Sequence, residues 1–83
     1  MTADELRTLA VEKRLDARGV SCPGPLLETK RAITGVPSGG VMEILSSDCG
    51  TPSDLGRWAV KVGHEYLGDL QEDGHYRIFL RIR

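Results

Sequence analysis

The sequence predicts an α+β fold, a two-layer sandwich in which two helices pack on one mixed four-stranded sheet. Three observations lead to this prediction. Helical and extended patterns follow one another in the order β-α-β-α-β-β, residues 41–46 form a nearly continuous apolar run, and residues 76–83 alternate like a half-buried strand. A chain of 83 residues has room for one domain and one core.

A short helical extension precedes the sandwich. Residues 2–10 can form a helix because Thr2 and Glu5 have the spacing of a capping box. A helix this short is marginal alone, so it docks on the domain or frays. We therefore assign residues 1–12 to an N-terminal extension and residues 13–83 to the domain. The apolar residues of the extension form one stripe: Leu6, Leu9 and Ala10.

The first strand is predicted at Val11–Ala17. Its apolar residues share one parity, although Lys13 interrupts the alternation. Arg18 and Gly19 then turn the chain, and Gly19 supplies the backbone freedom that a tight turn requires.

The first long helix is predicted at Cys22–Thr34, so that Cys22 stands at its first position. Pro23 suits the first turn because its missing N–H is not needed there, and Pro25 is still early enough to be tolerated. Gly35 fits the position just after the helix, and Pro37 prevents its continuation. The expected buried side consists of Leu26, Leu27, Ile33 and the stem of Lys30.

The second strand-to-helix unit begins with Val41–Ser46, whose apolar run indicates a central strand covered on at least one face. Thr51 is the expected N-cap of the next helix, with Asp54 in its first turn. This helix spans about Pro52–Val62 and ends at Gly63. Its apolar face comprises Leu55, Trp58, Ala59 and Val62.

A β-hairpin closes the chain. His64–Leu70 is the predicted third strand, with Tyr66 and Leu70 pointing inward. Glu72–His75 contains the Asp-Gly pair of a tight hairpin turn. The last strand follows at residues 76–83.

Composition excludes several classes of protein. A net charge of -1 with both signs interspersed gives no basic field for nucleic acid. Two cysteines are too few for a disulfide scaffold, and their spacing is not that of a zinc site. The first residues are polar and do not resemble a signal peptide. We therefore expect a cytoplasmic protein with free thiols and with neither a metal nor an organic cofactor.

The two cysteines occupy equivalent places in the predicted fold. Cys22 follows the first strand and precedes the first helix, and Cys49 follows the second strand and precedes the second helix. Because a right-handed crossover joins parallel strands, both junctions should lie at the same edge of the sheet. The sequence does not decide whether the two thiols come within disulfide reach.

Cys22 is the expected nucleophile. A thiol at a helix N-terminus faces unpaired N–H groups and the positive end of the helix dipole, both of which favour the thiolate and attract anions. Asp48 should raise the pKa of the neighbouring Cys49 thiol or form a local hydrogen bond, so Cys22 is the better candidate for a low pKa. The supporting residues expected around the two thiols are Arg18, Gly19, Pro23, Gly24, Pro25, Asp48 and Thr51.

Other polar residues have structural interpretations. His75 lies in the hairpin turn and is expected to be solvated, whereas His64 should lie at the sheet edge opposite the cysteines. Trp58 has the helical spacing of a core residue. Asp48 and Asp54 are interpreted as loop and cap residues rather than a catalytic pair.

Residues 15–25, Leu-Asp-Ala-Arg-Gly-Val-Ser-Cys-Pro-Gly-Pro, resemble the opening signature of the TusA-like sulfur-carrier family, also called SirA-like. The similarity continues through the acidic loop at Asp48, the second helix and the final hairpin, and covers about residues 13–83. The pairs Asp48-Cys49, Trp58-Ala59 and Gly63-His64 look most like the YeeD-like branch, whose members accompany a YeeE-type thiosulfate-uptake membrane protein.

The resemblance implies a β-α-β-α-β-β sandwich and a function. The family's motif cysteine, which corresponds to Cys22, accepts sulfane sulfur as a persulfide and passes it to a partner protein. Family members serve tRNA thiolation, molybdenum-cofactor pathways or sulfur oxidation, but many lack a cysteine at the position of Cys49. This difference favours the handling of thiosulfate, a small sulfur-containing anion, and the resemblance implies a place at the inner face of the membrane beside a YeeE-like protein.

Three functional hypotheses follow. In the first, the protein is a sulfur carrier or sulfurtransferase in which Cys22 holds the sulfur and a partner or Cys49 receives it. In the second, it is a regulatory binding subunit of a transporter or sulfur-relay enzyme, and the cysteines are incidental. In the third, Cys22 and Cys49 form a reversible disulfide, although their spacing is not that of a dithiol redox motif.

Overall fold

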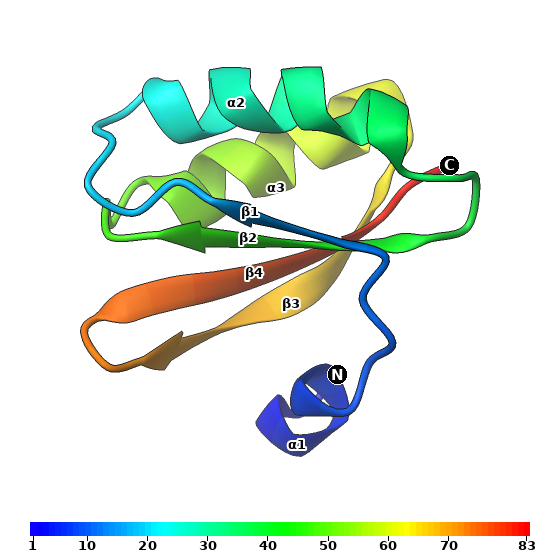
Figure 1. The fold of residues 1–83 in the computed structure, drawn as a ribbon, viewed down its shortest axis with the longest axis horizontal. Helices are drawn as coiled ribbons and strands as arrows, with labels where there is room; N and C mark the ends of the chain where they lie inside the picture. The colour runs from blue at the N-terminus through cyan, green and yellow to red at the C-terminus, as the bar shows by residue number, and fades with distance from the viewer.

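The structure, a computed structural model, describes all 83 residues and confirms the predicted fold class. Its sheet has the strand order β1-β2-β4-β3, in which β1 and β2 are parallel and β4 is antiparallel to both of its neighbours. Helices α2 and α3 cover one face of the sheet, and α1 lies on the other (Figure 1). The elements are α1 (Ala3–Arg7), β1 (Lys13–Asp16), α2 (Gly24–Ala32), the 3-10 turn η1 (Ile33–Gly35), β2 (Val41–Ser46), α3 (Thr51–Val62), β3 (Glu65–Glu72) and β4 (His75–Arg81).

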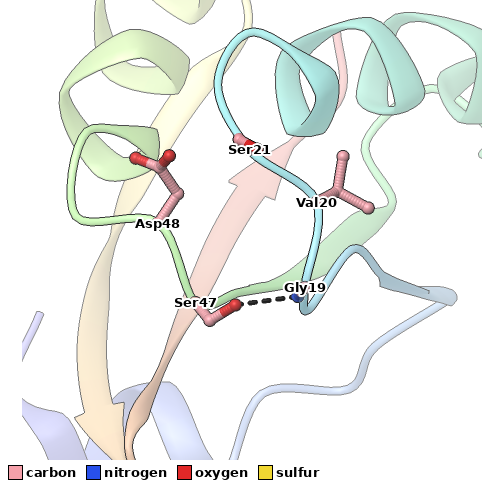
Figure 2. Close-up of a pocket in the computed structure, with 5 residues that line it drawn as sticks. All are labelled: Gly19, Val20, Ser21, Ser47 and Asp48. Carbon is pink, nitrogen blue, oxygen red and sulfur yellow. Dashed lines mark hydrogen bonds between the residues drawn. The ribbon is translucent and has the colours of Figure 1, made fainter.

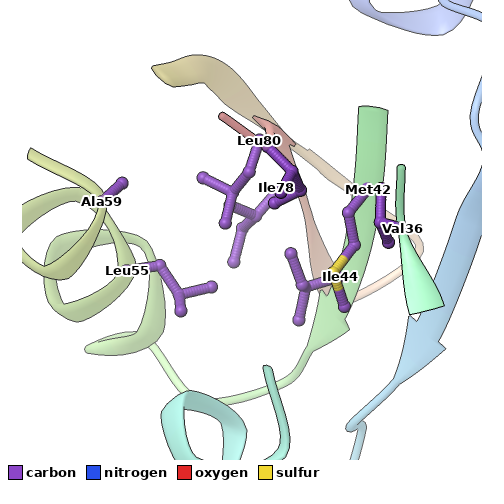
Figure 3. Close-up of a cluster of buried hydrophobic side chains, with 8 residues drawn as sticks. Val36, Met42, Ile44, Leu55, Ala59, Ile78 and Leu80 are labelled. Atoms are coloured by element: carbon purple, nitrogen blue, oxygen red, sulfur yellow. The ribbon is translucent and has the colours of Figure 1, made fainter. Parts of the chain in front are cut away.

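The main core lies between the sheet and the two long helices. Every residue of β2 is buried, as expected for a central strand. Leu55 and Ala59 of α3 are fully buried against the central strands, which confirms the predicted apolar face of this helix. Figure 3 shows this cluster, which consists of Val36, Met42, Ile44, Leu55, Ala59, Ile78, Leu80 and Ile82. This packing holds α3, and with it the loop that carries Cys49, against the sheet.

The predicted buried side of helix α2 is confirmed only in part: Leu26 and Ile33 pack against the main core, but Leu27 and Lys30 do not. Pro25 and Thr29 are its buried residues, whereas Leu27 is 49% exposed and Lys30 is exposed. The Thr29 hydroxyl can be buried because it donates a hydrogen bond of 2.8 Å to the Pro25 carbonyl. The apolar pattern of α2 is weak, so the sequence alone did not fix its rotation.

The second face of the sheet is covered by α1. Its capping box is present as predicted, with reciprocal hydrogen bonds between Thr2 and Glu5. Leu6 is only 2% exposed and forms a second cluster with Val41, Leu67, Leu70 and Phe79. The prediction of a half-buried final strand is therefore wrong at Phe79, which is fully buried because α1 covers it.

A β-bulge between Tyr66 and Gly68 changes the facing of β3. Tyr66 packs on the main core, whereas Leu70 belongs to the second cluster, so the two residues point inward on opposite faces of the sheet. Gly68 permits the close approach of α1, since a Cβ at this position would lie 3.2 Å from Leu6 Cδ1. The alternation of apolar residues in the sequence could not reveal that Tyr66 and Leu70 face opposite sides. A bulge adds one residue to the strand, and this reverses the face on which all later side chains lie.

A buried ion-pair network connects the second face to α1. Glu43 of β2 is fully buried and accepts hydrogen bonds from Arg14 (3.0 Å) and Arg77 (2.6 Å). Arg77 also contacts Glu72 at 2.9 Å, and Glu72 contacts Arg7 of α1 at 2.9 Å. These contacts satisfy the buried carboxylate, as a charge in a sheet interior requires.

The hairpin turn is as predicted, with Asp73 and Gly74 both at positive φ. Helix α3 ends at Gly63, which adopts the left-handed conformation at φ 88°. None of the helices is long and apolar enough to span a lipid bilayer.

Candidate functional site

Two loops meet where β1 and β2 end, as the topology predicted. The Gly19 amide donates a hydrogen bond of 2.8 Å to Ser47 Oγ, and the Cys22 amide donates one of 3.0 Å to Asp48 Oδ2. The first of these bonds is shown in Figure 2. The loops enclose a small open pocket of about 190 Å³, lined by Gly19, Val20, Ser21, Ser47 and Asp48. The segment before Cys22 is thus fastened to the segment before Cys49.

Asp48 joins these loops through its carboxylate. Oδ2 accepts the Cys22 amide, and Oδ1 accepts the Gly50 amide at 2.8 Å. These two hydrogen bonds hold the pKa of Asp48 below its usual value. The local hydrogen bonding expected from the sequence is present, and it organises both loops.

Cys22 lies outside the helix, contrary to the prediction. Helix α2 begins at Gly24, with Pro23 in the N-cap position, and the peptide bond from Cys22 to Pro23 is cis. A residue that precedes proline is disfavoured from helical backbone angles, which explains why the helix does not include Cys22. The cysteine is exposed and free, so its thiol is available to a reactant.

The Cys22 thiol faces a carboxylate. Its Sγ donates a hydrogen bond to Asp54 Oδ2 with a separation of 2.9 Å. This hydrogen bond, together with burial and the negative charges of Asp54 and Asp48, raises the pKa of Cys22, and Arg57 partly opposes the rise. The expected low pKa is therefore wrong for this state of the site, because two carboxylates outweigh the helix N-terminus.

Asp54 is the site residue that sequence reasoning missed. It lies in the first turn of α3, where it had been interpreted as a helix-cap residue. Its Oδ1 accepts a hydrogen bond of 2.8 Å from Arg57, and Oδ2 accepts that of Cys22. The available signal in the sequence is an acidic residue in the first turn of the helix that follows the second strand-to-helix junction.

Cys49 is exposed and free in the loop before α3. Thr51, the expected N-cap of α3, is instead its first helical residue, and Gly50 takes the cap position. The Thr51 hydroxyl is buried and shares a hydrogen bond of 2.8 Å with Ser46 Oγ. It anchors the helix to the end of β2 and does not cap it.

The remaining supporting residues shape the Cys22 loop. Arg18 is paired with Asp16 at 2.7 Å, which lowers the pKa of that carboxyl to about 2. Gly19 turns the chain at φ 81°. Gly24 is required by close packing, because a Cβ there would lie 2.2 Å from Val20 Cγ1.

A cationic groove between α2 and α3 begins beside the thiol. It has a volume of about 260 Å³ and is lined by Leu26, Lys30, Asp54, Arg57, Trp58 and Lys61. Asp54 lines this groove and also bonds Cys22, so the thiol lies at its margin. Neither Lys30 nor Lys61 forms an ion pair, which leaves the groove with a local excess of positive charge.

The histidines have structural surroundings. His64 Nδ1 accepts the Arg83 amide at 3.2 Å, and its ring lies 5.1 Å from that of Trp58. Burial and the nearby Arg83 lower the pKa of His64. His75 begins β4 at the hairpin and is half-buried.

No group of three or more His, Cys, Asp or Glu side chains is arranged to hold a metal ion.

Comparison with known proteins shows one consistent similarity. The family model described as sulfurtransferase TusA matches residues 13–82. A putative sulfur carrier protein, YrkF of Bacillus subtilis, is 45% identical over 67 residues, which cover 81% of this chain and 36% of YrkF. A putative sulfur carrier protein of Archaeoglobus fulgidus is 40% identical over 67 residues, covering 81% of this chain and 92% of that protein.

Solved structures give the same result for the fold. The crystal structure of a SirA-like protein from Desulfitobacterium hafniense superposes with a TM-score of 0.73 at 25% sequence identity. The match covers 83% of this chain and 95% of that protein. The chain thus spans nearly all of the small relatives and about a third of YrkF.

Proposed function

Because the chain belongs to the TusA family of sulfur carriers, we propose that it takes up sulfane sulfur as a persulfide on Cys22 and relays it to another thiol. The observation that carries this proposal is the presentation of Cys22. Its thiol is exposed and free, yet the Cys22 amide is fixed by Asp48 and the Cys22 thiol is fixed by Asp54. A reactive sulfur on a small carrier needs both access and a defined direction.

The chemistry requires two exchanges at sulfur. The Cys22 thiolate attacks the outer sulfur of thiosulfate, forming a new S–S bond while the old S–S bond breaks and sulfite leaves with its electron pair. Cys22 then carries the sulfur as a persulfide anion. An acceptor thiolate attacks the outer sulfur, takes it as its own persulfide and releases the Cys22 thiolate. No net oxidant or reductant is consumed.

Cys49 is a candidate acceptor for the relayed sulfur. Its exposed, free thiol immediately follows Asp48, whose carboxylate also holds the Cys22 amide. The two cysteine-bearing loops are thereby held next to each other, which favours a second thiol acting in the same reaction sequence. A thiol on a partner protein is the alternative acceptor.

Thiosulfate is the donor that the sequence details favour. The YeeD-like features Asp48-Cys49, Trp58-Ala59 and Gly63-His64 support a role beside a YeeE-type thiosulfate-uptake membrane protein. Free thiols and persulfides persist in a reducing compartment, so we place the activity in the cytoplasm, at the inner face of the membrane.

The groove between α2 and α3 supports the approach of an acidic partner. Its lining includes three cations, Lys30, Arg57 and Lys61, together with the half-buried Leu26 and Trp58. Positive charge beside a reactive group increases the encounter rate with a negatively charged surface. An acidic segment next to the donor or acceptor thiol would fit this face.

Single-thiol variants test the proposal. We expect Cys49→Ser to gain the mass of one sulfur atom after incubation with thiosulfate, and Cys22→Ser to gain none. The added mass should disappear when a thiol acceptor is supplied. Loading of Cys22→Ser to the level of the wild type would contradict the assignment of Cys22 as the carrier.

The same samples separate the rival hypotheses. A redox pair predicts loss of two hydrogens and a Cys22–Cys49 bond in the wild type without gain of sulfur. A regulatory binding subunit predicts neither change, and full pathway activity of the double variant Cys22→Ser/Cys49→Ser. Either result would replace the sulfur-carrier mechanism.

A further inference from the structure

A carboxylate is an unfavourable neighbour for a sulfur nucleophile. The thiolate is the reactive form of cysteine, and a negative charge at hydrogen-bond distance opposes its formation. Nevertheless, Cys22 Sγ lies 2.9 Å from Asp54 Oδ2. The Cys22–Asp54 contact therefore does not serve to stabilise the thiolate, and another role must explain it.

The charged groups around the thiol are few. From α3 come Asp54, which contacts Sγ directly, and Arg57, which pairs with Asp54 at 2.8 Å. From the loop before α3 comes Asp48, which holds the Cys22 amide. The cations Lys30 of α2 and Lys61 of α3 line the same groove.

Asp54 is held in place more firmly than its partner Arg57. The Asp54 side chain is 21% exposed, whereas that of Arg57 is 77% exposed. The carboxylate is fixed by two side chains, with one oxygen on the guanidinium and the other on the thiol. In this contact the Cys22 thiol is the donor and the Asp54 oxygen is the acceptor.

We propose that Asp54 is a positioning residue that keeps Cys22 as a protonated thiol directed toward the groove in the empty carrier, and that Arg57 moderates this effect. If the protein is the sulfur carrier proposed above, the empty carrier stays unreactive until the thiol proton leaves. The proton passes to a base in solution or on the donor. Asp54 and Arg57 thereby act in opposite directions on the same thiol.

The opposite effects of Asp54 and Arg57 on the Cys22 thiol give a direct test. The rate of alkylation of Cys22 by iodoacetamide is measured as a function of pH in a Cys49→Ser background, so that one thiol reacts. Asp54→Asn should move the midpoint to lower pH and increase the rate at pH 7 by roughly two- to fivefold, the range of an exposed charge interaction. Arg57→Gln should move the midpoint to higher pH and decrease the rate at pH 7.

The matched control is Asp4→Asn, the same chemical change at an exposed residue of α1 on the other face of the sheet. It should leave the profile unchanged. A general loosening of the loop would move both test variants in the same direction. Midpoints that move together, or an Asp54→Asn midpoint equal to that of the background, would overturn the proposal.

Alkylation needs no sulfur donor, so this test is independent of the proposed function. Opposite shifts without any loading from thiosulfate would refute thiosulfate as the sulfur donor of Cys22 and leave the role of Asp54 intact. Loading on Cys22 with an unchanged Asp54→Asn alkylation profile would refute the role of Asp54 and leave the sulfur-carrier mechanism intact. Thermal unfolding of each variant confirms that the folded protein is compared.

Discussion

At the scale of single residues, the Cys22 loop is shaped by contacts with its own neighbours. Val20 packs so close to the start of α2 that a side chain at position 24 would require Val20 or the loop to move. Asp48 then fixes the backbone of Cys22, and Asp54 fixes its sulfur. The direction of the thiol therefore depends on residues from both strand-to-helix junctions.

Gly24→Ala tests the packing of this loop. The added Cβ would lie 2.2 Å from Val20 Cγ1, so Val20 or the loop must move. We expect a loss of about 1 kcal/mol in the free energy of unfolding and a slower loading of Cys22. The double variant Val20→Ala/Gly24→Ala removes the clash and should recover the loading rate measured for Val20→Ala alone. Failure of this recovery would show that the clash is not the cause.

The position of the thiol could be predicted from the sequence, whereas its protonation could not. Chain order places Cys22 and Cys49 after parallel strands, and parallel strands end at one edge. The effect of Asp54 depends on a hydrogen bond between residues on different elements. Hydrophobic periodicity says nothing about such a contact, so the helix N-terminus alone could not predict the pKa of the thiol.

At the scale of elements, the two long helices contribute differently. The strong apolar face of α3 was predicted from its spacing and packs as expected on the sheet. Helix α2 has only Pro25 and Thr29 fully buried, and it leaves Lys30 free on the groove side. Lys30 is therefore an exposed cation at the edge of the groove.

Charge reversal in the groove tests the partner prediction. Lys30→Glu/Lys61→Glu should slow sulfur transfer from loaded Cys22 to a cysteine peptide flanked by glutamates, and speed transfer to a lysine-flanked peptide. Added salt should reduce both differences because the cations are exposed. Arg31→Glu, on α2 but outside the groove, is the control and should have little effect. If the wild-type protein transfers sulfur to the two peptides at equal rates, the prediction of an acidic partner is wrong.

At the scale of the whole molecule, the sheet is covered on both faces. The sequence predicted a docking or fraying extension, and the structure shows docking, with Leu6 in the second cluster and Arg7 paired with Glu72. The bulge in β3 and the glycine at position 68 make room for Leu6, and neither is visible as a periodic pattern. We propose that residues 13–83 carry the sulfur chemistry and that residues 1–12 stabilise them.

Leu6→Ala tests this division of labour. Loss of a fully packed leucine should lower the free energy of unfolding by about 2–4 kcal/mol, measured by urea denaturation. Leu27→Ala, the same change at a half-exposed residue, should cost less than about 0.5 kcal/mol. Both folded variants should still load sulfur on Cys22. Loss of loading in folded Leu6→Ala would assign α1 a part in the reaction.

As the proposed carrier residue, Cys22 should receive the sulfur first. Time-resolved peptide mapping of the wild-type protein after addition of thiosulfate measures this directly, because the two cysteines fall in different peptides. We predict that the peptide containing Cys22 gains one sulfur atom at the earliest times, and that any gain on the Cys49 peptide appears later and requires Cys22. If sulfur appears first on Cys49, or appears on Cys49 in the Cys22→Ser variant, then Cys22 is not the residue that first accepts the sulfur.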